Sequence, residues 1–171
     1  MSWTNFQMPE RIDLDEQSYS NTFGRFVVQP LEKGFGVTIG NMFRRVLLSS
    51  LQGAAITAIR VEGIQHEFTT IPGVFEDVTE LVLNLKQVRL KLLNKRIEKI
   101  VLPIKGPGEL KAADIQKQTS EIEILNPDLH LASLNEEAEL EMELRIGKGR
   151  GYVTADENKI IDLSKEKEQI I

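Results

Sequence analysis

Residues 139–146, E-L-E-M-E-L-R-I, constrain the fold of this chain more than any other stretch. Charged and apolar side chains alternate along the segment, and a β-strand directs successive side chains to opposite faces of its sheet. One face of this strand is therefore apolar and the other is charged. Antiparallel sheets with one buried face and one solvated face show this pattern. The apolar residues are Leu140, Met142, Leu144 and Ile146.

Several shorter segments also predict strands, so the chain is rich in β-structure. Apolar or β-branched runs that end at glycine, proline or charged residues are typical of such strands. The predicted strands lie at residues 23–31, 55–62, 66–70, 88–92, 100–104, 121–125 and 129–134. The segment G-K-G-R-G at 147–151 is predicted to be a turn at a solvated hairpin tip, and the segment G-P-G at 106–108 a loop.

Two helices are predicted from apolar residues that recur at helical spacing. The first extends from about Thr38 to Leu51 and follows a turn that contains glycines. The second extends from Phe75 to about Leu85. The apolar face of the second helix consists of Phe75, Val78, Val82 and Leu85. Helices beside a mostly antiparallel sheet indicate the α+β class.

The glycine turn before the first helix can be compared with phosphate-binding loops. Gly34, Gly36 and Gly40 have the spacing G-x-G-x-x-x-G, whereas the dinucleotide fingerprint has G-x-G-x-x-G. The Gly-Lys-Ser/Thr sequence of a Walker loop is absent. We therefore interpret the glycines as positions that permit positive φ and close backbone packing. A nucleotide-binding enzyme that uses the Gly34–Gly40 turn stays open as an alternative.

The first helix presents two different sides when its residues are placed at intervals of about 100°. One side predicts a packing face and consists of Ile39, Phe43 and Val46, flanked by Met42 and Leu47. The opposite side consists of Asn41, Arg44, Arg45 and Leu48. Arginine is favoured at protein interfaces because its planar guanidinium donates several hydrogen bonds. This second side is either a solvated surface or a contact surface for a partner protein.

Catalytic and metal-binding patterns are poor in this sequence. The chain has no cysteine, which excludes disulfides, thiolate zinc sites and a cysteine nucleophile. Its two histidines, His66 and His130, are far apart and lack the spacing of metal ligands. We interpret the adjacent carboxylates at 76–77 and 136–137 as solvated. We therefore expect no catalytic residue, no metal and no cofactor.

The formal net charge of −5 argues against a dedicated nucleic-acid binder, because such proteins carry a basic excess on one face. A local basic surface built from Arg25, Lys33, Arg44 and Arg45 leaves a nucleic-acid-binding module open as a second alternative. The sequence has no apolar run long enough for a signal peptide or a membrane-spanning helix. We therefore expect a cytoplasmic protein.

Three blocks of sequence resemble the N-terminal region of bacterial RNA polymerase alpha subunits. They are L-E-K-G-F-G-V-T-I-G-N-M-F-R-R-V-L-L-S-S, H-E-F-T-T-I-P-G-V-F-E-D-V-T-E-L-V-L-N-L-K and G-R-G-Y-V, in the family's order and at its separations. The resemblance covers nearly the whole chain and is weakest in residues 1–20 and 91–137. It is far more specific than any of the short motifs.

This resemblance implies a two-part α+β fold, with an assembly and dimerisation domain and an inserted, mostly antiparallel β-domain. Residues 1–52 would form the first segment of the assembly domain, and residues 53–171 the inserted domain. The chain would be a non-catalytic subunit of DNA-directed RNA polymerase, a nucleotidyltransferase. In that family two alpha subunits dimerise and recruit the beta and beta-prime subunits for transcription. The expected chain binds neither nucleic acid nor a membrane directly.

The resemblance also implies contacts for individual residues. The family's beta-contacting arginine falls on Arg45, with Leu48 one turn further along and Arg44 on the same side of the helix. The family's beta-prime contact falls in the block L-N-L-K, at Lys86. The face for the domain core and the dimer would consist of Ile39, Phe43, Val46 and Leu47.

The family continues beyond the last residue of this chain, Ile171. It adds further strands, a long helix that completes the dimer interface, and a separate DNA-binding domain. We therefore interpret the chain as a truncated subunit. Truncation puts its dimerisation in question and would leave the apolar face of the first helix partly uncovered.

Overall fold

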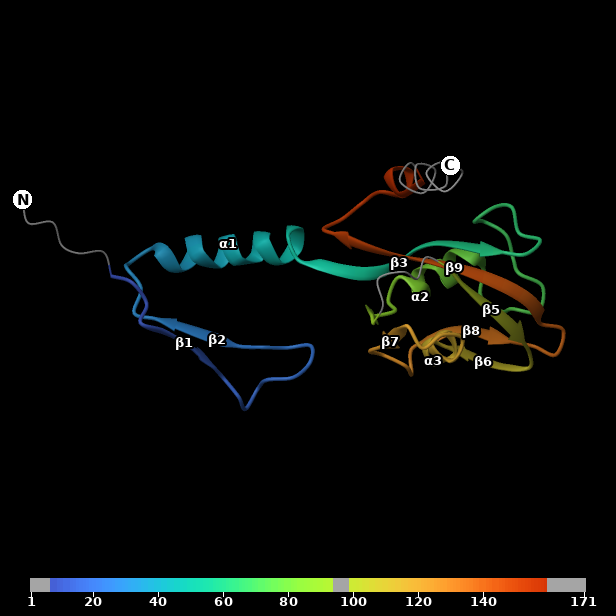
Figure 1. Ribbon diagram of the computed structural model, residues 1–171, viewed down its shortest axis with the longest axis horizontal. Coiled ribbons are helices and arrows are strands. Elements are labelled where there is room, and N and C mark those ends of the chain that lie inside the picture. The colour runs from blue at the N-terminus through green and yellow to red at the C-terminus, as the bar shows by residue number, and fades with distance from the viewer. Residues whose placement is uncertain (1–6, 94–98, 160–171) are drawn as a thin grey trace, which may run out of the picture. The chain divides into compact units, whose positions relative to one another are not determined.

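The structure is a computed structural model that describes residues 7–93 and 99–159 (Figure 1). The chain divides into two compact units, Met1–Leu51 and Gln52–Ile171, which we call unit 1 and unit 2. Every buried residue in the described part of the chain belongs to unit 2. Unit 2 therefore has a hydrophobic core, whereas the described part of unit 1 has none.

Unit 1 consists of a β-hairpin and one helix. Strands β1 (Arg11–Leu14) and β2 (Phe26–Gln29) pair antiparallel, and helix α1 (Phe35–Ser49) follows them. The strand predicted at 23–31 is present in its central part. The short segment of β1, R-I-D-L, gives no clear strand signal in the sequence and becomes a strand only through its pairing with β2.

Helix α1 begins about one turn earlier than the sequence predicts. Gly34 precedes it with φ of 91°, a left-handed conformation that glycine adopts without strain. Gly36 and Gly40 lie inside the helix, where an added Cβ would meet no atom within 4 Å. Of these three positions, only position 34 therefore requires glycine for its backbone conformation.

Unit 2 is built on a five-stranded antiparallel sheet with the order β5-β9-β3-β4-β7. Its strands are β3 (Gln52–Val61), β4 (Leu90–Leu92), β5 (Lys99–Lys105), β7 (Ile122–Ile124) and β9 (Glu139–Arg150). A second ladder joins β6 (Gly108–Lys111) to β8 (His130–Leu134). This mixed α/β content with an antiparallel sheet agrees with the predicted fold class.

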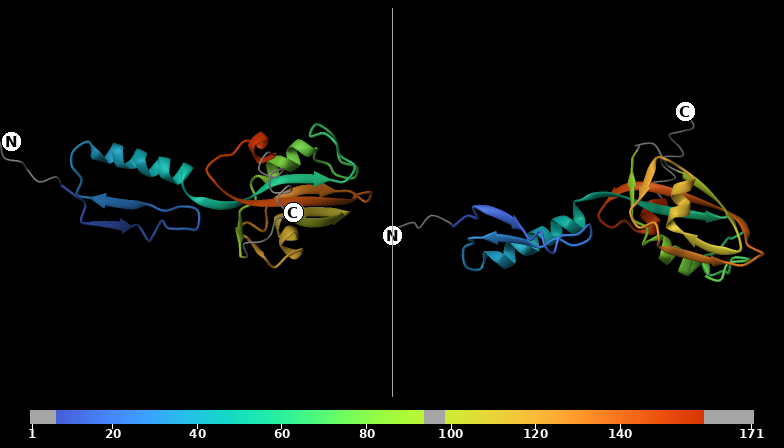
Figure 2. Two further views of the ribbon diagram at one scale, coloured as in Figure 1. Left: turned by 45° about the horizontal axis from the view of Figure 1, so that its top comes forward. Right: turned by 90° about the horizontal axis from the view of Figure 1, so that it is seen from below.

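Two helices complete the core of unit 2 (Figure 2). Helix α2 (Val78–Leu85) contacts β8, and the short helix α3 (Ala112–Lys117) contacts β7. The largest fully buried side chains among the described residues are Leu81, Leu102, Ile115, Ile122, Leu131, Met142 and Leu144. No helix in the described residues is long and apolar enough to cross a membrane.

Strand β9 confirms the predicted alternation and also extends beyond it. Every second residue from Met142 to Ile146 is buried, and the residues between them are only partly covered. The predicted turn at 147–151 is wrong, because β9 continues to Arg150. The two glycines of β9 in this segment pair with Ala55 and Gly53 of β3. Small residues thus face one another across this end of the ladder.

The segment that leads into α2 also differs from the prediction. Residues 66–70 do not form the predicted strand, since Thr70 makes only an isolated bridge to Asp77. The Asp77 carboxylate accepts a hydrogen bond from the backbone N–H of Glu80 at 2.7 Å and caps α2, so this carboxylate is not merely solvated. Phe75 precedes the helix and is 77% exposed, so its predicted place on the apolar face is wrong.

Two glycines of unit 2 approach the turn between β8 and β9 too closely to carry a side chain. A Cβ on Gly73, where φ is +80°, would overlap the backbone of Ala138, and a Cβ on Gly106 would overlap the carbonyl oxygen of Asn135. Backbone hydrogen bonds hold these segments together. Asn135 N–H donates to Gly73 O at 2.9 Å, and Gly106 N–H donates to Ala138 O at 2.9 Å.

Candidate functional site

Helix α1 carries most of the residues that the sequence singles out, and none of them is buried. We call Ile39, Phe43, Val46 and Leu47 the apolar row. Ile39 is half-buried, whereas the other three side chains are between 45% and 60% exposed. Unit 1 buries no side chain among its described residues, so the hairpin does not cover this row. An apolar helix face of this kind is stabilised by packing against another surface.

The opposite side of α1 carries Arg44, Arg45 and Leu48, which we call the arginine face. All three residues are exposed, and Leu48 is 64% exposed. Neither arginine forms an ion pair with any residue in ranges 7–93 and 99–159. The two guanidinium groups therefore keep their hydrogen-bonding capacity for groups outside the described residues.

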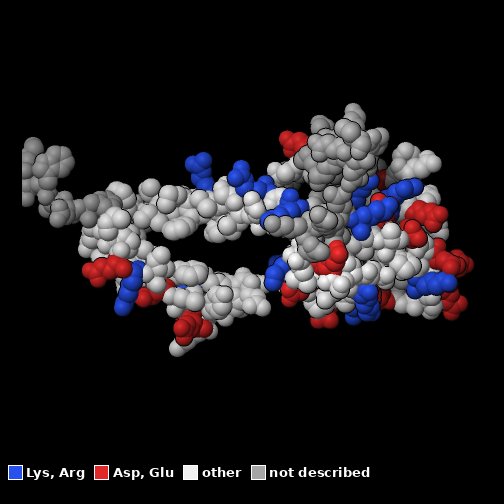
Figure 3. Space-filling model, in the orientation of Figure 1, with Lys and Arg blue, Asp and Glu red and all other residues white. Residues whose placement is uncertain are grey.

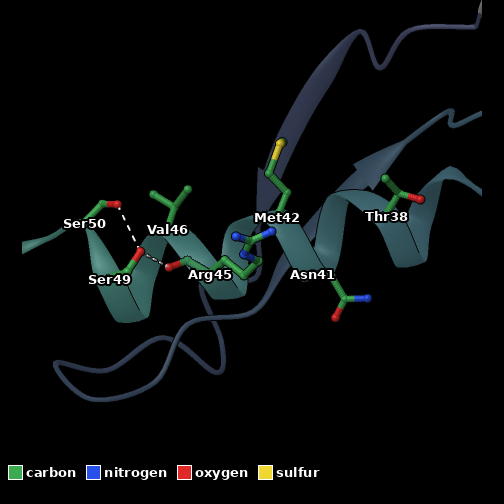
Figure 4. A pocket seen from close by; sticks show the side chains of 7 residues that line it. All are labelled: Thr38, Asn41, Met42, Arg45, Val46, Ser49 and Ser50. Carbon is green, nitrogen blue, oxygen red and sulfur yellow. Dashed lines mark hydrogen bonds between the residues drawn. The ribbon is translucent and has the colours of Figure 1, made fainter. Parts of the chain in front are cut away.

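A shallow groove runs along α1 between these two surfaces (Figure 4). Met42 and Val46 point to one side of it, and Asn41 points to the other. The lining residues are Thr38, Asn41, Met42, Arg45, Val46, Ser49 and Ser50. Because all of them come from one helix and the residue that follows it, the groove is open and does not enclose a small molecule. It suits contact with another protein better than binding of a cofactor.

The glycine-rich segment does not have the geometry of a phosphate-binding loop. In such loops the glycines precede the helix, so that backbone N–H groups point at the phosphate. Here Gly34 precedes α1, but Gly36 and Gly40 lie within the helix. The nucleotide-binding alternative therefore loses the observation on which it depended.

The charges of unit 1 do not favour the nucleic-acid alternative either. Helix α1 carries arginines and no carboxylate, whereas the hairpin carries both signs, as in the pair of Arg11 with Asp13 at 3.1 Å. Over unit 2, Lys and Arg are interspersed with Asp and Glu in the view of Figure 3. Proteins that bind nucleic acid usually concentrate basic residues on one face.

Lys86 lies at the carboxyl end of α2, in unit 2. Its backbone N–H donates to Val82 O at 3.0 Å, and its side chain is exposed. A cation at this position is favourable because the partial negative charge of a helix gathers at its carboxyl end. The neighbouring Leu83 is 54% exposed. Lys86 and Leu83 thus place a cation and an apolar side chain together outside the core.

A cluster around His130 in unit 2 is not evident from the sequence. The Nδ1 atom of His130 lies 2.7 Å from a carboxylate oxygen of Glu109, and its Nε2 atom lies 2.9 Å from one of Glu76. Glu76 also accepts hydrogen bonds from the backbone N–H of Ser133 at 2.7 Å and from its hydroxyl at 3.1 Å. The prediction that Glu76 is simply solvated is therefore wrong.

The cluster favours a protonated histidine. Carboxylates accept hydrogen bonds, so both ring nitrogens of His130 donate when both contacts form. The hydrogen bond to Glu76 raises the pKa of His130 most, followed by that to Glu109, and partial burial opposes them. Partial burial raises the pKa of Glu76, but its hydrogen bonds from Ser133 and His130 outweigh this and lower it. The pKa of Glu109 is lowered by His130 and then by Lys111.

This cluster is structural and does not resemble a metal site. The two carboxylates contact different nitrogens of one imidazole ring, and a single metal ion binds only one of those nitrogens. No group of histidine and carboxylate ligands in the described ranges is arranged to hold a metal ion. The cluster instead connects β6, β8 and the segment before α2.

We expect the cluster to stabilise unit 2 most between about pH 4.5 and pH 6.5, the ordinary pKa values of glutamate and histidine. The raised pKa of His130 gives stability that is present below 6.5 and is lost as pH rises through the folded-state value. The lowered glutamate pKa values give stability that is lost as pH falls below 4.5. Replacing His130 with glutamine should flatten this dependence of the free energy of unfolding on pH.

Urea denaturation at a series of pH values tests this expectation. His66→Gln is the matched control, because it removes the other histidine, which is exposed. The control should keep the wild-type dependence on pH. Equal curves for wild type and His130→Gln between pH 5 and pH 8 would contradict the role assigned to His130.

Two comparisons with known proteins show which sequences this chain is similar to. A family model described as the RNA polymerase Rpb3/RpoA insert domain matches residues 59–170. The DNA-directed RNA polymerase alpha subunits of Prosthecochloris aestuarii and Chloroherpeton thalassium are 57% and 54% identical to this chain over 153 residues. Each of these alignments covers 90% of this chain and 47% of the relative.

The alpha subunit of Salinibacter ruber is 54% identical over 159 residues, which is 93% of this chain and 48% of the relative. The chain thus spans about half the length of the curated relatives it matches. Both comparisons agree with the resemblance found in the three blocks of sequence.

Proposed function

The chain belongs to the RNA polymerase alpha-subunit family that carries the Rpb3/RpoA insert domain, and from this membership we infer that it is a non-catalytic assembly scaffold. In this proposal it dimerises and recruits the beta and beta-prime subunits for DNA-templated transcription. The observation that carries the proposal is helix α1, whose apolar row and arginine face are both exposed in a unit that buries no side chain.

The different composition of the two units supports the same proposal. The region that matches the insert-domain model, residues 59–170, lies entirely within unit 2, which has its own apolar core. We assign residues 53–171 to this inserted domain and residues 1–52 to the first segment of the assembly domain. The boundary between the compact units, after Leu51, supports this assignment.

The beta subunit is the proposed partner of the arginine face. Arg44 and Arg45 are unpaired within the described residues, and Leu48 provides an exposed apolar contact beside them. Interfaces commonly combine arginine with an apolar anchor in this way. The beta-prime subunit is the proposed partner of Lys86, which stands exposed beside Leu83. These two contacts lie on different units and can therefore be tested separately.

The second alpha subunit is the proposed partner of the apolar row. Phe43 and Val46 are 50% and 45% exposed, and their row contains no charged side chain. Complete burial of a fully exposed side chain of this kind contributes roughly 1.5–3 kcal/mol, so covering the exposed half of one contributes about half of that.

We expect Arg45→Ala to weaken binding of the beta subunit at least tenfold, about 1.4 kcal/mol. Removing one partner of a buried charge pair costs roughly 2–5 kcal/mol, partly because the remaining charge is left unpaired. The fold should be unchanged, because Arg45 is exposed and its side chain contacts no core residue. Affinity is measured by surface plasmon resonance with purified beta subunit, and the fold by circular dichroism.

Two variants serve as controls. Arg25→Ala removes another exposed arginine of unit 1 and should bind beta as the wild type does. Lys86→Ala should also keep its affinity for beta, but should reduce the amount of beta-prime that joins a preformed complex of alpha and beta. Undiminished binding of beta to Arg45→Ala would refute the assignment of the arginine face.

A further inference from the structure

Strand β8 holds helix α2 near both of its ends. At the amino end, the carboxylate of Glu76 accepts a hydrogen bond from the backbone N–H of Ser133 at 2.7 Å and lies 2.9 Å from Nε2 of His130. In the last turn, the side-chain amide of Asn84 donates to the carbonyl oxygen of Leu131 at 3.0 Å. The helix therefore cannot shift along β8 without breaking one of these two anchors.

The two anchors determine where α2 presents its exposed side chains. Lys86 follows Asn84 by two residues, and Leu83 precedes it by one. Both Lys86 and Leu83 are exposed, whereas Leu81 and Leu85 of the same helix are buried in the core of unit 2. Groups that are held in their binding position before a partner arrives lose less conformational freedom on association. The anchors therefore favour any contact made through Lys86 and Leu83.

The anchor at the amino end depends on the charge of His130. Strand β8 packs chiefly against β6 and α2. The charged residues that these elements and their flanks contribute are Glu109, Lys111, Glu76, Asp77, Glu80 and Lys86. Glu109 and Glu76 contact the two ring nitrogens of His130, whereas Lys111 pairs with Glu109 at 3.2 Å. Two carboxylates at the ring against one nearby lysine favour the protonated imidazole.

Loss of the proton from His130 loosens this anchor. A neutral imidazole has one N–H, so it donates to only one of the two carboxylates, and the other then faces an unprotonated nitrogen. The hydrogen bond that remains has an uncharged donor and is weaker than a bond between two charged groups. Ser133 still holds Glu76, so the anchor is weakened and not lost. The contact of Asn84 with Leu131 involves no titratable group.

We propose that β8 positions α2 for its contact with the beta-prime subunit, and that protonation of His130 controls how rigidly α2 presents Lys86 and Leu83. This inference rests on the proposed function and adds regulation by pH to the same contact. His130, Glu76 and Asn84 are positioning residues, because they act on the partner through α2. The affinity for beta-prime is therefore highest when His130 is charged and falls as the pH rises.

The test measures binding of beta-prime to a preformed complex of this chain with beta, by surface plasmon resonance from about pH 6 to about pH 8.5, on either side of the range in which histidines titrate. The affinity of the wild type relative to His130→Gln should be about fivefold higher at the acidic end, the lower end of typical coupling between sites, and about equal at the alkaline end. His66→Gln removes the other histidine and should keep the wild-type profile.

Two further variants identify which contact the profile reports. Glu109→Gln should shift the midpoint of the profile to lower pH, because it removes a carboxylate that favours the charged ring and leaves the contacts of α2 in place. Asn84→Ala should weaken binding by a similar factor at every pH, because its anchor does not titrate. An unchanged midpoint in Glu109→Gln would overturn the assignment of the profile to His130.

Ile104→Val is the control for stability, because it removes a methyl group from the core on β5 without touching the anchors. It should bind beta-prime as the wild type does. A loss of affinity as large as that of His130→Gln would show that the cluster acts only through the stability of unit 2, and would overturn the inference.

The inference and the proposed function fail in different ways. Wild-type affinity of His130→Gln at every pH, together with loss of binding in Lys86→Ala, would overturn this inference and leave the proposed function standing. Wild-type affinity of Lys86→Ala would instead overturn the proposed contact of α2 with beta-prime.

Discussion

Replacing Gly106 with alanine is expected to unfold unit 2 or to lower its free energy of unfolding by about 4 kcal/mol or more, a value at the top of the range for single substitutions. The added Cβ would overlap the carbonyl oxygen of Asn135. The backbone at Gly106 and the turn at 135–138 cannot move apart easily, because Gly106 N–H donates a hydrogen bond to Ala138 O of that turn at 2.9 Å. The overlap also involves backbone atoms, so a change of side-chain rotamer does not relieve it.

Gly149→Ala is the matched control for this prediction. Gly149 lies in the ladder between β3 and β9, but an added Cβ there would meet no atom within 4 Å. We expect the free energy of unfolding of the Gly149→Ala variant to stay within about 0.5 kcal/mol of the wild-type value. Urea denaturation followed by circular dichroism measures both variants. Equal midpoints for the two would contradict the close packing of Gly106 against the 135–138 turn.

Leu144→Ala should lower the free energy of unfolding of unit 2 by about 2–5 kcal/mol, the usual cost of removing a buried leucine side chain. Leu144 has no exposed surface. It lies on strand β9, which pairs with β3 and β5, and is directly opposite Ile59 of β3 and Ile100 of β5. Its loss therefore opens a cavity that three strands border, and partial collapse of these strands cannot fill it completely.

Hydrogen–deuterium exchange checks this prediction at the level of individual strands, and urea denaturation gives the total change. Protection should fall in β9, β3 and β5 together. Leu144→Met keeps most of the volume and should cost less than about 1.5 kcal/mol. Val101→Ala, on the other face of β5 and 40% exposed, should cost less than Leu144→Ala. A loss for Val101→Ala as large as that for Leu144→Ala would disprove the assignment of the buried face.

Regular local patterns predicted the main elements of the fold because those patterns depend on neighbouring residues alone. The alternation in 139–146 identifies the buried face of β9, and helical spacing identifies Val78 and Leu85 as core residues of α2. The position of Arg45 and Leu48 opposite the apolar row also follows from helical geometry. No contact from elsewhere in the chain was needed for these inferences.

The predictions failed where distant segments decide the local structure. The glycines in 147–151 suggested a turn, but β3 supplies Gly53 and Ala55 opposite them, so a long strand forms instead. Phe75 has the spacing of a helical core residue, yet Asp77 caps the helix after it. Such outcomes depend on pairing partners that the local sequence does not contain.

The cluster around His130 was missed for the same reason. His130 is 54 residues from Glu76 and 21 residues from Glu109. The ladder between β6 and β8 brings Glu109 close to His130, and the hydrogen bonds of Ser133 hold Glu76. The one signal in the sequence was a histidine at the start of a predicted strand, which by itself does not indicate a partner.

The absence of a buried side chain in the described part of unit 1 has a consequence for how its stability is set. Unit 2 holds its core with its own side chains, so the free energy of its folding is a property of the chain. Helix α1 gains comparable burial only from groups outside the described residues, and where those groups belong to a bound molecule the stabilisation grows with the logarithm of its concentration. Under the proposed function, the order of unit 1 is therefore governed by mass action, and it rises and falls with the concentration of the proposed partner subunits.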